Sequence, residues 1–148
     1  QVGKRSVWYK IKNEATTSPA ARRNRIITVD TFPSLVPPTS GCPPQQPLDT
    51  LLAVYIGPDQ ANSFSQLQPL AFNDDYEENV DVYSRVIFLA PPTPQAYYIA
   101  VDGKNGSSGN FILRIMSEPA PEGFKNRVGQ ITEEELNAAL QAEAKAKE

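Results

Sequence analysis

The stretch Ser6-Val7-Trp8-Tyr9-Lys10-Ile11 shows the pattern that decides the fold. In an extended strand, successive side chains point to opposite faces, so Val7, Tyr9 and Ile11 share one face. Trp8 and Lys10 fall on the other face. Such alternation is typical of a half-buried strand in an antiparallel sheet. Residues 6–11 are therefore predicted to form a strand.

Similar runs recur along most of the chain. Each has the length of a strand, is rich in β-branched or aromatic residues, and is bounded by Pro, Gly, Asn or Asp. They cover residues 25–30, 51–56, 67–72, 84–88, 97–101 and 111–115. About seven strands with no helical stretch between them predict an all-β protein, folded as an antiparallel β-sandwich.

Composition excludes several classes of function. The chain has 148 residues and a net charge of −3, which fits one domain and argues against nucleic-acid binding, because neutralising phosphates needs excess Lys and Arg. No apolar run approaches the roughly 18 residues of a membrane span. The chain has no histidine and one cysteine, Cys42, so it cannot by itself build a Ser-His-Asp or Cys-His mechanism, a His-containing zinc site or an internal disulfide.

The sequence divides into three parts. Residues 1–117 are predicted to form the sandwich domain, 118–131 a linker and 132–148 a helical tail. Thr132 and Glu135 have the spacing of a capping box, which predicts where the helix begins. Its apolar face is thin, so the helix either frays or leans on something. The proline-rich excursion 32–48 contains Cys42, which is either a free thiol or pairs with a cysteine elsewhere.

Oxygen-bearing side chains gather after the fourth predicted strand. Calcium takes six to eight oxygen ligands from carboxylates, amides and carbonyls. The predicted calcium ligands are Asp49, Asn73, Asp74, Asp75 and Asp102. The spacing is not that of an EF-hand, and a solvated acidic loop with Asx turns is the alternative.

Aromatic and basic residues suggest two further surfaces. Five aromatic residues could form a platform for sugar, although core packing is the preferred interpretation for most of them: Trp8, Tyr9, Tyr55, Tyr97 and Tyr98. The N-terminal quarter is basic through Lys4, Arg5, Lys10, Lys12 and the cluster 22–25. These cations are either a solvated surface or a charge-complementary contact with a neighbouring chain.

Several motifs follow one another in a familiar order. They are Ser6–Lys10, Val29–Phe32, Leu48–Tyr55, Asn73–Asp75, Ser84–Val86 and Tyr97–Gly103. Over residues 5–116 the chain resembles the bacterial pre-peptidase C-terminal domain family. The resemblance implies a jelly-roll-like sandwich from an extracellular, periplasmic or cell-surface protein, used for binding or stabilisation rather than catalysis. Some relatives bind calcium. The family has one or two strands before the one that matches residues 6–10, and we expect them to be missing here, which would leave a sheet edge open. The alternatives are that those strands lie outside this chain or that the proline-rich excursion covers the edge.

Together these observations predict a non-enzymatic structural or binding module of a secreted or cell-envelope protein. We expect it to be a subunit of a larger assembly, stabilised by calcium if the acidic site is real. Its contacts with other chains would run through the N-terminal basic strand, whose edge should lie open, and the C-terminal helix. The alternative is a carbohydrate- or substrate-binding accessory domain of a secreted hydrolase. A carboxylate-based hydrolase would need two acids about 5–10 Å apart in a cleft.

Overall fold

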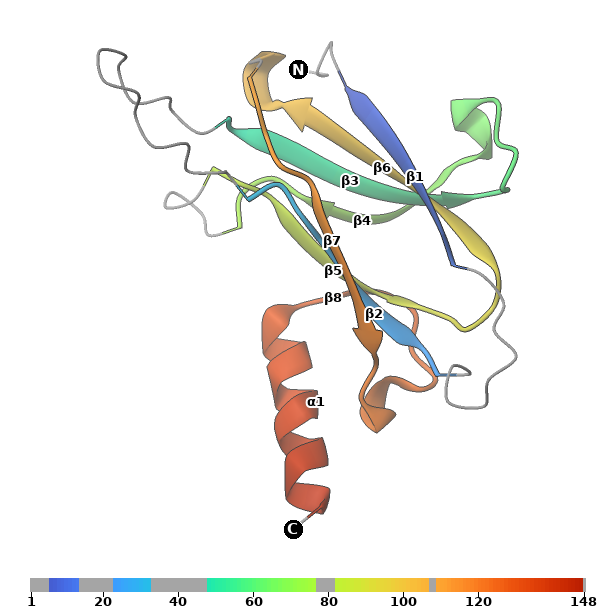
Figure 1. The fold of residues 1–148 in the computed structure, drawn as a ribbon, viewed down its shortest axis with the longest axis vertical. Helices are drawn as coiled ribbons and strands as arrows, with labels where there is room; N and C mark the ends of the chain where they lie inside the picture. The colour runs from blue at the N-terminus through green and yellow to red at the C-terminus, as the bar shows by residue number, and fades with distance from the viewer. Residues whose placement is uncertain (1–5, 14–22, 33–47, 77–81, 107–108, 148) are drawn as a thin grey trace.

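The computed structural model describes residues 6–13, 23–32, 48–76, 82–106 and 109–147. These residues form two four-stranded antiparallel sheets and one C-terminal helix (Figure 1). Sheet A has the order β1-β6-β3-β4, and sheet B has the order β7-β2-β5-β8. The strands are β1 (Val7–Asn13), β2 (Arg25–Asp30), β3 (Thr50–Gly57), β4 (Gln68–Asn73), β5 (Arg85–Ala90), β6 (Gln95–Gly103), β7 (Arg114–Pro119) and β8 (Gly129–Ile131). The predicted all-β sandwich is confirmed.

The main core lies between the two sheets. Alternate residues of each strand point inward, and Leu52, Val54 and Ile99 from sheet A are completely buried. They meet Val29 and Phe88 from sheet B, which are equally inaccessible. The period-two pattern of the sequence therefore places one apolar face of each sheet in this core.

A second apolar cluster covers the outer face of sheet B. In strands β2 and β5 every residue after the first is buried, so both of their faces are covered. Ile26, Ile87 and Leu89 point away from the main core and pack with Phe124 and Ile131. Residues from the C-terminal part of the chain thus complete the domain rather than trailing from it.

The linker expected over residues 118–131 is replaced by ordered structure. Strand β7 runs on to Pro119, a 3-10 turn spans Glu122–Phe124, and β8 pairs with β5. Phe124 is 6% exposed, and the buried Asn24 side chain donates hydrogen bonds to the carbonyls of Phe124 and Arg127 at 2.9 Å. The prediction that residues 118–131 are only a linker is therefore wrong.

The last predicted strand is also displaced. It was expected over residues 111–115, but the ladder with β2 runs from Arg114 to Pro119. Phe111 and Leu113 still pack against the main core. Their apolar side chains are therefore explained by burial, although these residues are not paired in a strand. With β8 added, the described residues form eight strands instead of about seven.

The helical tail is confirmed as α1 (Glu133–Ala146). Thr132 is its N-cap, and both hydrogen bonds of the capping box are present. Leu136 and Ala139 pack against the second cluster, whereas Leu140 is 49% exposed. The helix therefore leans on the sandwich with its first turns and points away from it beyond them (Figure 1). No helix in the described part of the chain is long and apolar enough to cross a membrane.

Some expectations fall outside the described residues. These include most of the proline-rich excursion with Cys42, and the basic residues Lys4 and Arg5.

Candidate functional site

β1 and β7 are the edge strands on one lateral side of the sandwich, and we call this side the open end. β1 is the first strand of sheet A and pairs with β6 alone among the described strands. β7 is the corresponding edge of sheet B and pairs with β2 alone. An edge strand presents a row of unpaired N–H and C=O groups to its surroundings.

Inward-facing side chains are half exposed at the open end. Tyr9 is in register with Ile99, which is completely buried, yet Tyr9 is 39% exposed. Ile115 on β7 is 40% exposed, although its partner Val29 is inaccessible. Val7, which shares the inner face with Tyr9, is 45% exposed. The core is thus covered on β6 and β2 and left uncovered one strand further out.

The opposite end carries β4 and β8, and we call it the closed end. There β4 packs against both β5 and β8. The inward Ala71 of β4 is buried in the main core, and Ile131 of β8 is buried in the second cluster on the outer face of sheet B. The Gln130 side chain also occupies the edge of β4. Its Nε2 donates to the Phe72 carbonyl and its Oε1 accepts from the Phe72 N–H, each at 3.1 Å. One side-chain amide therefore takes the place of a neighbouring strand's peptide group.

Aromatic side chains gather on the outer face of sheet A. The Trp8 ring lies 5.6 Å from the Tyr55 ring and 5.1 Å from the Phe64 ring. Trp8 is 37% exposed and Phe64 72% exposed. We call Trp8, Tyr55 and Phe64 the aromatic patch. The preferred interpretation of core packing is therefore wrong for most of the five aromatic residues. Tyr97 is the only one of the five that is fully buried.

The basic strand carries its lysines on the same outer face. Lys10 and Lys12 both contact the carboxylate of Asp59, at 2.8 Å and 3.1 Å. Hydrogen bonds from the two ammonium groups hold the pKa of Asp59 below its usual value, and the bond to Asp59 raises the pKa of Lys10. Two cations thus share one acid.

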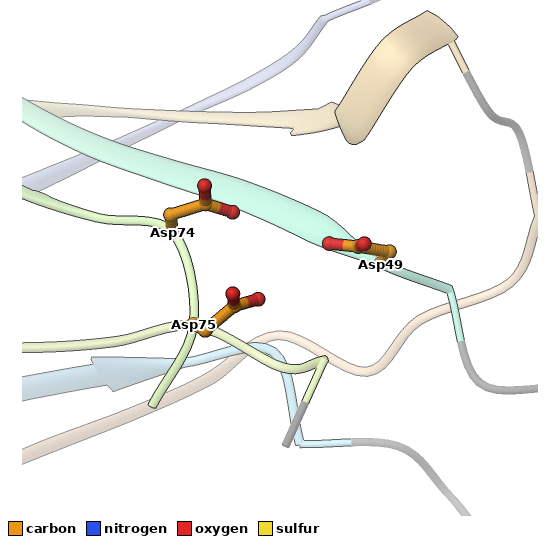
Figure 2. Close-up of side chains that lie close together, drawn as sticks. All are labelled: Asp49, Asp74 and Asp75. Atoms are coloured by element: carbon orange, nitrogen blue, oxygen red, sulfur yellow. The ribbon is translucent and has the colours of Figure 1, made fainter. Parts of the chain in front are cut away.

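The acidic residues form a cluster where β3 begins and β4 ends (Figure 2). One carboxylate oxygen each from Asp49, Asp74 and Asp75 lies within 4.8 Å of the others, and we call these three the acidic cluster. The Lys104 ammonium lies 3.1 Å from Asp74 and 3.3 Å from Asp75. Burial raises the pKa of Asp49, Lys104 opposes that rise, and the neighbouring carboxylates add to it.

The other two predicted calcium ligands have separate partners. The Asn73 side-chain oxygen accepts from the Arg85 N–H at 3.0 Å. Asp102 accepts from its neighbour Gly103 at 2.8 Å and from the Ser6 hydroxyl at 3.2 Å.

The acidic cluster fits a cation in its donor chemistry. In Asp49 and Asp74 the Oδ1 atoms are buried without a hydrogen-bond partner among the described residues, and carboxylate oxygens are the ligands that calcium takes. Lys104 already supplies positive charge to the cluster. A calcium ion at these oxygens would therefore have to compete with the ammonium group.

A buried charge network crosses the outer face of sheet B, and the sequence analysis missed it. Asp30 is completely buried, and its carboxylate accepts two hydrogen bonds from Arg114, at 2.7 Å and 3.0 Å. Arg85 reaches the same carboxylate at 3.4 Å and binds Glu133 at 2.6 Å. The Tyr76 hydroxyl also donates to Glu133, at 2.6 Å. The network links edge strand β7 to the first turn of α1.

Glu133 is the exposed end of this network. Burial alone would raise its pKa, but the hydrogen bonds from Tyr76 and Arg85 outweigh burial and hold the pKa of Glu133 below its usual value. A groove of about 380 Å³ lies beside these three residues. The only sequence signal was an acid, Asp30, at the end of a strongly apolar run.

Comparisons with family models, curated proteins and solved structures find no match to this chain. The resemblance to the pre-peptidase C-terminal domain family therefore rests on the quoted motifs.

Proposed function

We propose that the protein is a non-enzymatic structural or binding module that joins a larger assembly by accepting a strand at its open end. The observation that carries the proposal is the exposure of the inward-facing Val7, Tyr9 and Ile115. A strand added beside β1 would pair with its free N–H and C=O groups. It would also extend the core over these apolar side chains.

β1 suits strand addition better than β7. Its seven residues contain no proline, so every residue keeps its N–H group. β7 ends at Pro119, which has no N–H group to offer a new strand. Each strand carries two charged residues, so charge does not distinguish them. We therefore assign the acceptor role to β1 and a flanking role to β7.

The proposal also covers the topology, location, further contacts and calcium binding of the module. The motif resemblance supports a jelly-roll-like topology and an extracellular, periplasmic or cell-surface location. The outward half of α1, with Leu140 49% exposed, offers a second contact for the assembly. Calcium bound at the acidic cluster would stabilise the module without taking part in its contacts.

Site-specific photo-crosslinking tests the proposal. A photoreactive amino acid replaces Val7 in the full chain, produced in its native host. The matched control carries the same group at Phe72, which is 58% exposed on β4 at the closed end. We expect a protein adduct at position 7 that is absent at position 72. Equal yields at both positions, or none at position 7, would refute strand addition at the open end.

The aromatic patch favours a second candidate function, carbohydrate binding. Aromatic faces provide rigid apolar area, and Lys10, Lys12 and Asp59 supply polar groups on the same face. Pull-down with insoluble cellulose, chitin and peptidoglycan tests this function. Phe64→Ala should abolish retention while Phe32→Ala, another exposed aromatic change, leaves it intact. Retention that is absent in the wild type, or equal in both variants, argues against it.

A further inference from the structure

The sequence of β1 is self-complementary when two copies run antiparallel. In a two-fold symmetric interface, residue i meets residue j and residue j meets residue i. With the axis at Tyr9, Val7 lies opposite Ile11 of the partner subunit, and Tyr9 lies opposite its own copy. All these side chains belong to the inner face, which the single chain leaves half exposed. The pairing therefore joins apolar to apolar across the seam.

The outer face is also compatible in this register. Trp8 lies opposite Lys10 of the partner subunit, and Lys12 lies opposite Ser6 of the partner subunit. Directly opposite Cβ atoms are about 4.5–5.5 Å apart, so the Lys10 ammonium can reach the Trp8 ring for a cation–π contact. Since Lys10 shares Asp59 with Lys12, Asp59 keeps a cation even if Lys10 turns to the seam.

Other registers are worse. An axis at Lys10 places that lysine against its own copy, and an axis at Ile11 places Lys10 against Lys12 twice. Like charges directly opposite each other destabilise a sheet. An axis at Trp8 places the Trp8 ring against its own copy and Lys10 opposite Ser6 of the partner subunit, so the contact between Trp8 and Lys10 is lost. Half-residue shifts would set inner-face residues against outer-face residues, which a two-fold axis through the sheet forbids.

We infer that the strand accepted at the open end is β1 of a second copy, so that two chains form a two-fold dimer with one continuous eight-stranded sheet. This inference rests on the proposed function and names its partner. The dimer covers Val7 and Tyr9 of both copies and takes Trp8 into the seam, while Tyr55, Phe64 and α1 stay free for other contacts. A seam of one strand per subunit is small, so we expect dissociation in about the micromolar range.

Sedimentation velocity of the full chain, from roughly 1 to 200 μM, measures the dimer across that range. Tyr9→Lys and Tyr9→Glu each place like charges opposite one another at the axis, and each should weaken dimerisation at least about tenfold. An equal mixture of the two variants should restore the dimer, because lysine then faces glutamate. Phe72→Lys is the matched control, an apolar-to-lysine change on the exposed face of β4, and it should dimerise like the wild type.

Three results would overturn the inference: a wild type that stays monomeric throughout, a dimer that survives Tyr9→Lys, or a mixture that is not restored. The crosslinking experiment separates this failure from that of the proposed function. A foreign protein captured at position 7 by a monomeric chain refutes the dimer and keeps strand addition, whereas no adduct at position 7 removes both. Circular dichroism of each variant establishes that a lost dimer is not a lost fold.

Discussion

The two ends of the sandwich differ in how their edge strands are covered. At the closed end, β4 and β8 come together, Gln130 occupies the edge of β4, and the inward Ala71 is buried. At the open end, β1 and β7 have nothing beyond them among the described strands, and the inward Tyr9 and Ile115 are about two-fifths exposed. Both ends have apolar inward residues, but only one has the elements that cover them.

The difference teaches that burial in this domain depends on which segment returns to which edge. The closed end is completed by β8, and residues 120–128, which lead to it from β7, cover the outer face of sheet B on the way. No described segment returns to β1. Stability should therefore be concentrated at the closed end, and the open end should tolerate change unless a partner is bound.

The largest contrast is expected between Phe124→Ala and Val7→Ala. Phe124 is 6% exposed in the second cluster, so its removal leaves a cavity and should lower the free energy of unfolding by about 3–5 kcal/mol. Val7 is 45% exposed, so its truncation should change stability by less than about 0.5 kcal/mol in the monomer. Urea unfolding of both variants at low concentration measures the difference. Equal, small losses would mean that the C-terminal part does not stabilise the core.

The second contrast concerns how edge strand β7 is held. Asp30→Asn removes a buried charge that two arginines contact. We expect the free energy of unfolding, measured with urea, to fall by about 3 kcal/mol. The control is Asp59→Asn, where an exposed carboxylate meets two lysines and screening by water leaves little effect. A loss at Asp30 no greater than at Asp59 would show that β7 is held by its backbone ladder alone.

Local patterns made much of the fold predictable. Strand-length apolar runs, several of them with period-two alternation, identified six of the strands, and the Thr132–Glu135 capping box identified where α1 begins. Both kinds of signal lie within a few residues. The coverage of each sheet end was not predictable in this way. β8 has only three residues, and its burial depends on pairing with a strand some forty residues earlier.

The candidate sites show the same limit. Asn24 was interpreted as part of a basic cluster, yet its amide binds carbonyls 100 and 103 residues away. Asp30 meets Arg114 across 84 residues, and no local pattern indicates that contact. The acidic residues could be named as a group from the sequence, since Asp74 and Asp75 are adjacent. The sequence analysis did not identify Lys104 as their neighbour.

The third prediction is that calcium bound at the acidic cluster stabilises the domain, whatever covers its two ends. Saturation with calcium at about 100 times the dissociation constant would add roughly 2.7 kcal/mol, and extracellular sites bind at about 10⁻⁴ to 10⁻³ M. We expect a small rise in melting temperature at about 10 mM calcium over chelator. The rise should be larger in Lys104→Met, which removes the competing ammonium, but not in Lys147→Met. No rise in any of the three proteins would refute a calcium site.

The smallest expected effect concerns the hydrogen bonds and ion pair of Glu133, which connect the first turn of α1 to the sandwich. The folded-state pKa of Glu133 is lowered, so its contribution to stability is present above its unfolded pKa, about 4.3, and is lost as pH falls through the lower folded value. Because the side chain is 40% exposed, we discount the effect to about 0.5–1 kcal/mol.

Glu133→Gln should therefore cost this much at pH 7 and less at about pH 3, because the contribution is lost as pH falls through the lowered folded pKa. Glu134→Gln is the control, since the Glu134 side chain makes no hydrogen bond or ion pair with the described residues and occupies the same helical turn. Urea unfolding of the three proteins at the two pH values makes the comparison. A cost that persists unchanged at the lower pH would mean that Glu133 acts through packing, and the helix would then be held by Leu136 and Ala139 alone.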